Sequence, residues 1–343
     1  MHDPSRRNKR VTIADIAREA GVSKGAVSYA LNGLPGVSAS TRARVLAIAN
    51  ELGWYPNRAA RALSAARADA CGLVVARPAR MLALEPFFME FVSGVEAELS
   101  ARAVALTIQL AHDPAEEIEI YRRWWAERRV DGVMVYDPRV DDPRIHALVE
   151  LGLPAVVVGG PVEDSRLPSV WHDESSPVVE AVRYLGALGH TRIARVAGLG
   201  EFEHTVRRTR AFEEVVRELG VAARVVDTDY TPESGARATR RLLSLPEPPT
   251  GIVFDSDVLA VTGLGVAHQM GFSVPDDVSI VAWDDSLICQ VVHPPLTAMT
   301  RDIPSYGSAV ARRLLAEIDG EGAGDVEEQR AELVPRGSTG PVR

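Results

Sequence analysis

The sequence predicts a small all-α headpiece followed by a larger α/β region of two similar lobes, each built on a parallel, doubly wound sheet. Two observations support this fold class. Between residues 11 and 52, apolar residues recur at helical spacing, which predicts short amphipathic helices. From Cys71 onward, short apolar runs alternate with helical stretches, and the alternation starts again after residue 173, as two parallel sheets covered by helices require.

Charge is distributed unevenly along the chain. Of the 343 residues, 46% are hydrophobic and 25% are charged, and the formal net charge is −9. Residues 1–67 carry 11 Lys and Arg against 4 Asp and Glu, whereas the remainder carries 27 against 43. Only the amino-terminal part therefore favours a polyanion such as nucleic acid.

Cysteine content and hydropathy argue against several other classes. Cys71 and Cys289 are far apart and match no metal or redox spacing, so we expect two buried thiols and no disulfide. The sequence has no apolar run of membrane-spanning length, and its first ten residues lack the apolar segment of a signal peptide. We therefore expect a cytoplasmic protein without a membrane partner.

The first two predicted helices are separated by a three-residue corner. Thr12 caps the first helix, with Asp15 placed to reach back to it, and Gly21 ends it. Ser23 then caps a second helix. This is the shape of a helix-turn-helix, whose second helix lies in the major groove of DNA; an ordinary helical hairpin is the alternative. The candidate DNA-binding residues of the motif are Thr12, Ser23, Lys24, Gly25, Ala26, Ser28, Tyr29 and Asn32.

A third helix and an alanine-rich stretch complete the amino-terminal region. Ser38 opens the third helix, in which apolar residues keep helical spacing until Gly53. The later stretch NRAARALSAARA has high helix propensity but only one large apolar residue, Leu63. Because a helix of about ten residues is marginal alone in water, we expect it to order against a partner. A linker helix without a DNA role is the alternative.

From Val11 through Leu63 the sequence resembles the DNA-binding headpiece of the lac repressor and galactose repressor family. The likeness rests on VSYALNG, TRARVLAIANELGWYPN and RAARAL, and it continues at lower density through the rest of the chain. The resemblance implies a headpiece at residues 1–56 and a hinge helix with a linker at 57–69. In that family two hinge helices pair over the minor groove and wedge a leucine between base steps. The hinge candidates here are Asn57, Ala60 and Leu63.

Residues 70–343 are expected to bind an effector and to form a dimer. The first lobe is predicted at about 70–169 and 300–330, and the second at about 170–299. Two such lobes with a cleft between them form the periplasmic-binding-protein architecture, to which the resemblance also points. Ligands of open α/β sheets bind beyond the carboxyl ends of the strands.

The resemblance implies five effector-binding residues around that cleft. They are Phe87, Asp173, Arg208, Asp257 and Asp284. Each has a structural alternative: Phe87 as a core aromatic, and the aspartates as caps of the helices that follow them. Arg207 competes with Arg208 for the role of an arginine that clamps the ligand with its planar fork.

The sequence favours a regulator over an enzyme or an exported binding protein. The eight histidines show no HExxH or comparable ligand spacing, and an exported protein would carry a signal and no basic headpiece. We predict no catalytic residue, metal or cofactor. We expect a transcriptional regulator, specifically a repressor, that binds double-stranded operator DNA as a homodimer and responds to a small-molecule effector, a sugar or sugar derivative. The resemblance places the dimer interface near Val95 and Leu99.

Overall fold

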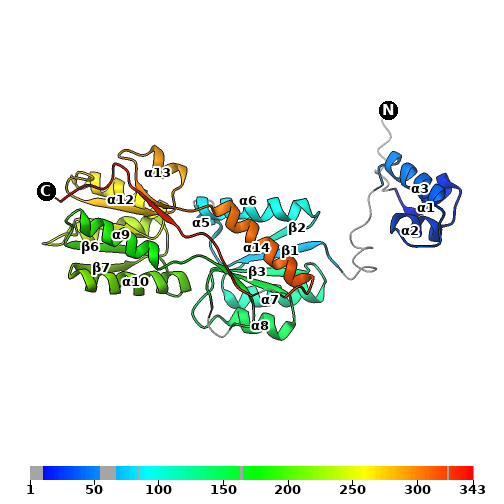
Figure 1. Cartoon of the computed structure of the whole chain (residues 1–343), viewed down its shortest axis with the longest axis horizontal. Helices are drawn as coiled ribbons and strands as arrows, with labels where there is room; N and C mark the ends of the chain where they lie inside the picture. Colours follow the sequence, from blue (N-terminus) through cyan, green and yellow to red (C-terminus); the bar gives the residue numbers. More distant parts are fainter. Residues whose placement is uncertain (1–10, 55–66, 83–84, 163–164, 323, 343) are drawn as a thin grey trace, which may run out of the picture. The chain divides into compact units, whose positions relative to one another are not determined.

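The computed structural model describes residues 11–54, 67–82, 85–162, 165–322 and 324–342. The chain divides into two compact units, residues 1–68 and 69–343, which we treat separately (Figure 1). The predicted hinge residues Asn57, Ala60 and Leu63 lie outside the described residues.

The described residues of the first unit, which we call the headpiece, form three helices: α1 (Ile13–Ala20), α2 (Lys24–Leu31) and α3 (Ala39–Glu51). They enclose one small apolar core, because the inward positions of each helix repeat every three or four residues. The buried members of this core are Ile16, Ala17, Ala20, Val27, Ala30, Val45 and Ala49.

The predicted helix boundaries of the headpiece are confirmed by their caps. Asp15 Oδ2 accepts hydrogen bonds from the backbone N–H (3.0 Å) and the hydroxyl (2.7 Å) of Thr12. Gly21 ends α1 with φ +63°, a conformation that costs glycine little. Ser23 Oγ accepts from the backbone N–H of Ala26 (3.1 Å), and Ser38 caps α3 in the same way through Thr41 (3.2 Å).

The second unit, which we call the body, contains two sheets with the alternating pattern that the sequence predicts. The first sheet has the strand order β11-β5-β4-β3-β1-β2, and its paired strands run parallel. Its strands are β1 (Ala70–Val75), β2 (Ala105–Leu110), β3 (Gly132–Tyr136), β4 (Ala155–Val158), β5 (Ser169–Trp171) and β11 (Val326–Glu327). The helices of this first lobe are α5 (Ala79–Leu82), α6 (Pro86–Ala101), α7 (Pro114–Ala126), α8 (Pro143–Leu151) and α14 (Ile303–Ile318).

The second sheet has the equivalent order β12-β10-β9-β8-β6-β7, in which only β12 pairs antiparallel. Its strands are β6 (Arg192–Ala197), β7 (Ala222–Asp227), β8 (Gly251–Phe254), β9 (Ser279–Trp283), β10 (Thr297–Thr300) and β12 (Glu332–Val334). The helices of this second lobe are α9 (Ser176–Ala187), α10 (Glu203–Leu219), α11 (Pro232–Leu243), α12 (Asp257–Gln269) and α13 (Leu287–Val291).

The chain passes between the two sheets three times: between β5 and α9, between β10 and α14, and between β11 and β12. Figure 1 shows these segments running alongside one another between the lobes. Because three connections join the lobes, residues on the crossing segments are placed where the two sheets meet.

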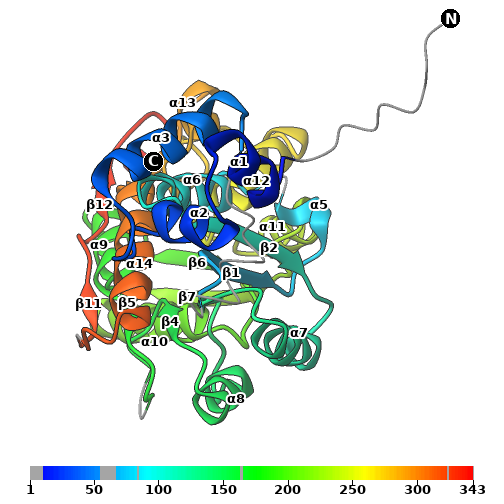
Figure 2. The same cartoon turned by 90° about the vertical axis from the view of Figure 1, so that its right-hand side faces the viewer.

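Helices cover both faces of each sheet, so the central strands β1, β3, β4, β8 and β9 are buried on both sides, whereas the edge strands β2 and β7 are partly exposed. In β1, Leu73 packs into the core beneath α6 and α14, whereas Val74 faces the core beneath α7 and α8. Figure 2 shows these two helix pairs on opposite sides of the first sheet. The continuous apolar runs predicted as strands follow from this double coverage.

The dimer interface expected near Val95 and Leu99 stays a prediction, because Glu96, Ala97 and Ser100 on the same helix are exposed although Val95 and Leu99 are not. Val95 and Leu99 on α6 are both 0% exposed and lie in the core between α6 and α14. The two helices approach closely at two glycines: a Cβ on Gly94 would lie 1.9 Å from the carbonyl oxygen of Pro304, and one on Gly307 would lie 2.2 Å from that of Phe91. This face of α6 is therefore internal to the lobe and cannot contact a partner.

Candidate DNA-binding face and effector cleft

The predicted DNA-binding residues of the headpiece lie largely on the solvent-facing side of α2. Lys24, Gly25, Tyr29 and Asn32 are exposed, whereas Val27 on the opposite side is fully buried. The helix is held by the core through Val27 and Ala30, which leaves its other face free for a partner.

Several members of this set also have local structural roles. The Ser23 hydroxyl caps α2, and the Asn32 amide donates to Ser28 Oγ (3.4 Å). Gly36, with φ +111°, brings its backbone against Tyr29, because a Cβ there would lie 3.3 Å from the ring. The loop after α2 therefore limits the space available to the Tyr29 side chain, which is 48% exposed.

In the body, a cleft lies at the carboxyl ends of both sheets and encloses a cavity of about 90 Å³. This is far below the roughly 300–1,000 Å³ of ordinary ligand pockets, so the lobes are closed on their own side chains. The charged, histidine and aromatic residues that line it are Arg77, Glu85, Phe87, Tyr136, Asp137, His172, Glu174, His204, Arg207, Arg208, Tyr230, Asp255, Asp257, Asp284, Arg301 and Tyr306.

Four of the five predicted effector residues line this cleft: Phe87, Arg208, Asp257 and Asp284. Asp173 is not among the lining residues. Its Oδ1 accepts hydrogen bonds from the backbone N–H groups of Ser175 (2.9 Å) and Ser176 (3.2 Å) at the start of α9, which is the capping alternative expected for it.

An ionic chain runs through the cleft and links Asp284, Arg301, Glu174 and Arg208; we call it the Glu174 network. Arg301 Nη2 lies 2.8 Å from Asp284 Oδ1, and its Nη1 lies 3.4 Å from Glu174 Oε1. Arg208 contacts the same carboxylate through Nε (2.6 Å) and Nη2 (2.5 Å) to Oε2. Although burial by itself raises the pKa of Glu174, the Arg208 and Arg301 charges outweigh it and lower that pKa to about 2. Glu174 is therefore ionised at neutral pH.

Both arginines of the Glu174 network also contact an aromatic ring through the face of the guanidinium group. The Arg208 guanidinium carbon lies 4.0 Å from the ring centroid of Trp283, and that of Arg301 lies 4.9 Å from Phe87. Arg207 lines the cleft too, but it pairs with Glu203 (3.4 Å) and donates to the carbonyl of Pro161. Arg208, with its side chain 5% exposed, is thus the arginine held inside the cleft.

A second ionic cluster lies on the first-lobe side of the cleft. Arg77 contacts Glu85 (2.6 Å) and Asp137 (2.8 Å), and its guanidinium carbon lies 5.2 Å from the ring of Phe202 and 5.1 Å from that of Tyr230. Burial raises the pKa of Glu85 to about 7, despite the Arg77 charge that opposes this. The positive charge of Arg77 therefore neutralises the Glu85 and Asp137 carboxylates only in part.

Two buried acceptors in the cleft lack hydrogen-bond partners among the described residues: Asp257 Oδ2 and His172 Nε2. The other ring nitrogen of His172 is 2.9 Å from the carbonyl oxygen of Gln329; this carbonyl requires a donor, so Nδ1 carries the proton and Nε2 accepts. Burial, with the Arg301 charge, lowers the pKa of His172 to about 4. Burial raises the pKa of Asp257 to about 6, and the Asp284 charge adds to this rise. The nearby Ser286 hydroxyl opposes the rise by hydrogen bonding to the carboxylate.

The sequence interpretation missed Glu174, Arg301 and Arg77 as cleft residues. Glu174 and Arg301 lie on the segments that cross between the lobes, in the SVWHDES and LTAMTRDIP stretches. Their signal was present, because each is a charged residue directly beyond a strand. Without the sheet topology, however, Asp173 and Glu174 were equivalent neighbours.

The lobes also touch directly, through the residues following β3 and those preceding α10. The backbone N–H of Val140 donates to the carbonyl of Glu201 (3.2 Å), and that of Glu203 donates to Pro138 (2.9 Å). Between these bonds, Arg139 Nε lies 3.2 Å from Glu201 Oε1. We call this contact the rim bridge; it closes one edge of the cleft.

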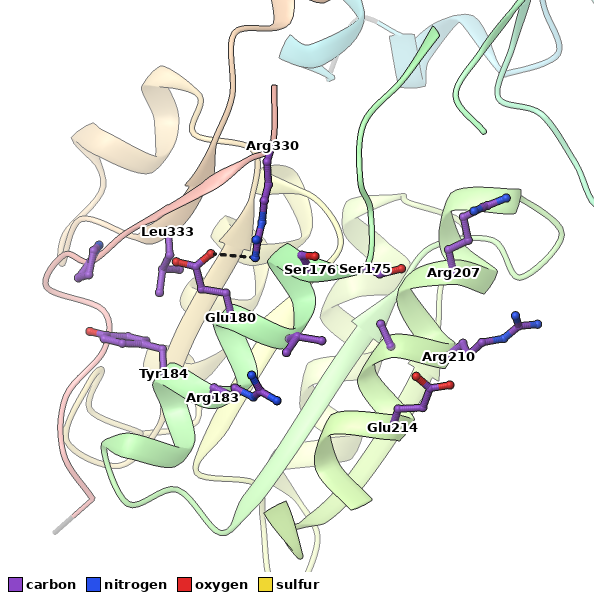
Figure 3. A pocket seen from close by; sticks show the side chains of 13 residues that line it. Ser175, Ser176, Glu180, Arg183, Tyr184, Arg207, Arg210, Glu214, Arg330 and Leu333 are labelled. Carbon is purple, nitrogen blue, oxygen red and sulfur yellow. Dashed lines mark ion pairs between the residues drawn. The ribbon is translucent and has the colours of Figure 1, made fainter. Parts of the chain in front are cut away.

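A larger, open groove of about 950 Å³ lies on the second lobe between α9 and α10 (Figure 3). Glu180 on α9 pairs with Arg330 (3.7 Å), as drawn in Figure 3, and Arg183 pairs with Glu218 (3.0 Å). Because these pairs are solvent-exposed, they hold their partners weakly. The groove lacks the buried, convergent polar groups of the cleft, which makes the cleft the better candidate for a small-molecule site.

Within the described parts of the chain, no group of three or more His, Cys, Asp or Glu side chains is arranged to hold a metal ion. A search of the same residues finds no helix that is both long and apolar enough to cross a membrane.

An exposed recognition helix, together with a two-lobed body that has a polar interior cleft, defines a DNA-binding regulator with a small-molecule site. Residues 12–57 match the family model of bacterial regulatory proteins of the lacI family, and residues 182–339 match the periplasmic binding protein-like domain. The transcriptional regulator AglR of Rhizobium meliloti is 35% identical, over 97% of this chain and 95% of that protein. The chain belongs to the lacI family of bacterial transcriptional regulators.

Solved structures agree with this assignment. The transcriptional regulator CelR in complex with cellobiose is 32% identical, with a TM-score of 0.73 over 96% of this chain and all of that one. The lac repressor dimer bound to operator and the anti-inducer ONPF is 25% identical, with a TM-score of 0.86 over 97% of this chain and all of that one. Both likenesses span the headpiece and the body.

Proposed function

We propose that this regulator is a repressor that binds operator DNA through α2 and is controlled by a sugar or sugar derivative bound in the cleft. The observation that carries the proposal is the convergence of Phe87, Arg208, Asp257 and Asp284 on one buried cleft at the carboxyl ends of both sheets. Carboxylates and arginines suit hydroxyl-rich ligands because they accept and donate several hydrogen bonds at once. The cellobiose bound to CelR supports a sugar of this kind.

The proposed mechanism couples the cleft to DNA through the relative position of the lobes. An effector that fits only one arrangement of the lobes shifts the population toward that arrangement. In a dimer this changes the spacing of the two hinges and therefore the affinity for the operator. The site of action is bacterial DNA in the cytoplasm. We assign no catalytic role, metal or cofactor to the protein.

We propose that the protein acts as a homodimer on a pseudo-palindromic operator, because one headpiece reads few base pairs and twofold protein symmetry implies twofold DNA. Since Val95 and Leu99 are internal, we expect the interface near them to use the exposed side of α6, including Glu96 and Ala97. Helix α13 exposes Leu287 (73%) and Val291 (69%), and an apolar surface of this kind is expected to be covered by a partner. The lac repressor dimer on its operator supports the assembly.

The test is operator binding by the full-length protein, measured by fluorescence anisotropy with and without a panel of neutral mono- and disaccharides that includes cellobiose. We expect one or more sugars to change operator affinity in the wild type and to leave Arg208→Ala without a response. Lys24→Ala and Tyr29→Ala should each weaken specific binding by about 1–3 kcal/mol while largely sparing nonspecific binding.

Failure of every sugar to alter operator affinity would contradict the effector assignment. Equal losses on specific and nonspecific DNA would show that Lys24 and Tyr29 contact only phosphates. For the hinge, Leu63→Ala is expected to lower operator affinity and the effector response together, and an unchanged response would remove Leu63 from the mechanism.

A further inference from the structure

The arginines inside the cleft are already neutralised by the chain's own carboxylates. Arg208 directs two nitrogens at Glu174 (2.6 and 2.5 Å) and donates to the carbonyl of Asp255 (3.4 Å). Arg301 directs two nitrogens at Asp284 (3.1 and 2.8 Å) and a third at Glu174 (3.4 Å). A carboxylate occupies the Nε/Nη2 edge of each guanidinium, so an anion could bind to that edge only by displacing a carboxylate.

The overall charge of the cleft also opposes an anion. Six carboxyl groups line it, those of Glu85, Asp137, Glu174, Asp255, Asp257 and Asp284, against four guanidinium groups, and Glu85, whose pKa burial raises to about 7, is only partly ionised at neutral pH. Asp255 is further compensated by Arg195, at 2.6 Å in the second-lobe core. Because charges in a buried site are poorly screened, bringing in a further negative charge is unfavourable.

The groups that remain open are acceptors. Asp257 Oδ2 and His172 Nε2 are buried, line the cleft and lack hydrogen-bond partners in the described structure. Asp257 is 3% exposed and His172 is 6% exposed. Asp257 also has the Ser286 hydroxyl nearby, and both positions can accept hydrogen bonds from the hydroxyl groups of a ligand.

We propose that Glu174 makes the cleft selective for effectors without negative charge, excluding sugar phosphates and sugar acids, by occupying Arg208 and Arg301 itself. The inference deepens the proposed effector site and rests on it for the identity of the natural ligand. Glu174 determines this selectivity because its carboxylate contacts both Arg208 and Arg301. Without its charge, Asp284 alone would face two guanidinium groups, leaving one available to an anion.

The experiment uses inorganic phosphate as the probe, on full-length protein, with chloride matching the ionic strength. Wild type is expected to show no phosphate-dependent thermal stabilisation. Glu174→Gln, which keeps the side-chain shape, is expected to bind phosphate at least about tenfold more tightly, since a unit charge next to two arginines is removed. The double variant Glu174→Gln/Arg208→Gln should lose this gain.

Glu180→Gln is the matched control, because it removes a carboxylate beside Arg330 in the open groove and should gain no comparable affinity. The proposal is overturned if wild type binds phosphate in a manner abolished by Arg208→Gln, or if Glu174→Gln gains no more than Glu180→Gln. The wild-type arm can overturn the proposal even if Glu174→Gln does not fold, and Glu174→Ala then takes its place as the variant expected to gain phosphate affinity. A panel of glucose, glucuronate and glucose 6-phosphate separates the two proposals: a response to the anionic members refutes the selectivity, whereas silence toward all neutral sugars refutes the effector assignment.

Discussion

Each lobe contains a nearly inaccessible arginine held by carboxylates, and the surroundings of the two differ. In the first lobe, Arg144 bonds Asp142 (2.6 Å), Glu117 (2.8 Å) and two backbone carbonyls at the end of β3. In the second lobe, Arg195 forms a bidentate pair with one carboxylate, Asp255 (2.8 and 2.6 Å). Neither Arg144 nor its carboxylate partners line the cleft, whereas Asp255 does.

The two sheets therefore share a strand order, but their buried arginines have different roles. The Arg144 network stabilises the first lobe at a distance from the proposed ligand. The Arg195 network reaches the cleft, because Asp255 pairs with Arg195 through its carboxylate and accepts from Arg208 through its backbone carbonyl (3.4 Å). Perturbing the second-lobe arginine should therefore affect binding as well as stability.

The largest expected effect comes from removing the arginine with two carboxylate partners. Arg144→Met should lower the free energy of unfolding of the body by about 3–5 kcal/mol, since Asp142 loses its counter-charge and Glu117 keeps only a longer contact with Arg139 (3.9 Å). Arg195→Met removes the counter-charge of one carboxylate, Asp255. It should therefore lower the free energy of unfolding by less than Arg144→Met does, but it should also alter effector affinity. Urea denaturation of both variants checks this; an Arg195 variant more destabilised than the Arg144 variant would reverse the comparison.

The next largest loss of stability is expected at glycines where helices pack, because a Cβ added there would meet backbone in the first lobe and a side chain in the second. In the first lobe, Gly94→Ala drives a Cβ into the backbone of Pro304, so we expect a loss of about 3 kcal/mol. In the second lobe, a Cβ on Gly235 would meet the end of the Leu259 side chain at 2.7 Å. That side chain can move, and Gly235→Ala should be tolerated far better. Thermal melts of the two variants test this, and equal melting temperatures would contradict it.

The cleft side of the second lobe should show a pH-dependent effect at Asp257. Its folded pKa of about 6 lies above the ordinary value of 3.8, so burying the charged form opposes folding above pH 6. That penalty fades as pH falls through 6 and is gone below about pH 4. Asp257→Asn should therefore stabilise the protein by about 2 kcal/mol at pH 8 and progressively less at acidic pH. A gain that is the same at pH 8 and pH 4 would rule out this origin.

The smallest effect is expected where the lobes touch directly. Arg139→Ala removes the side-chain part of the rim bridge, whose Glu201 partner is 57% exposed, together with a longer contact to the buried Glu117 (3.9 Å), so the loss of stability should be about 1 kcal/mol. The lobes should nevertheless open more readily, which small-angle scattering would detect as a larger radius of gyration. Arg183→Ala, which breaks an exposed pair within the second lobe, is the control. Identical scattering from both variants would show that the rim bridge does not hold the cleft closed.

Much of the fold follows from local sequence signals. The capping residues Thr12, Ser23 and Ser38 and the stop at Gly21 determined the headpiece helices, because each signal acts within one turn of the chain. In the body, the alternation of apolar runs with helical stretches predicted two parallel sheets, whereas the family resemblance singled out Phe87, Arg208, Asp257 and Asp284. In the parallel arrangement the carboxyl ends of the strands meet at one edge, where Asp257 and Asp284 follow β8 and β9.

Other features depended on contacts between distant parts of the chain. The sequence could not distinguish Asp173 from Glu174, since only the path of the crossing segment directs one carboxylate to the cap of α9 and the other toward Arg208 and Arg301. It also could not show that Val95 is internal, because α6 meets α14 more than 200 positions later in the chain. Local patterns determine which elements form, whereas the pairing of buried charges is decided only when the sheets bring them within a few ångströms of one another.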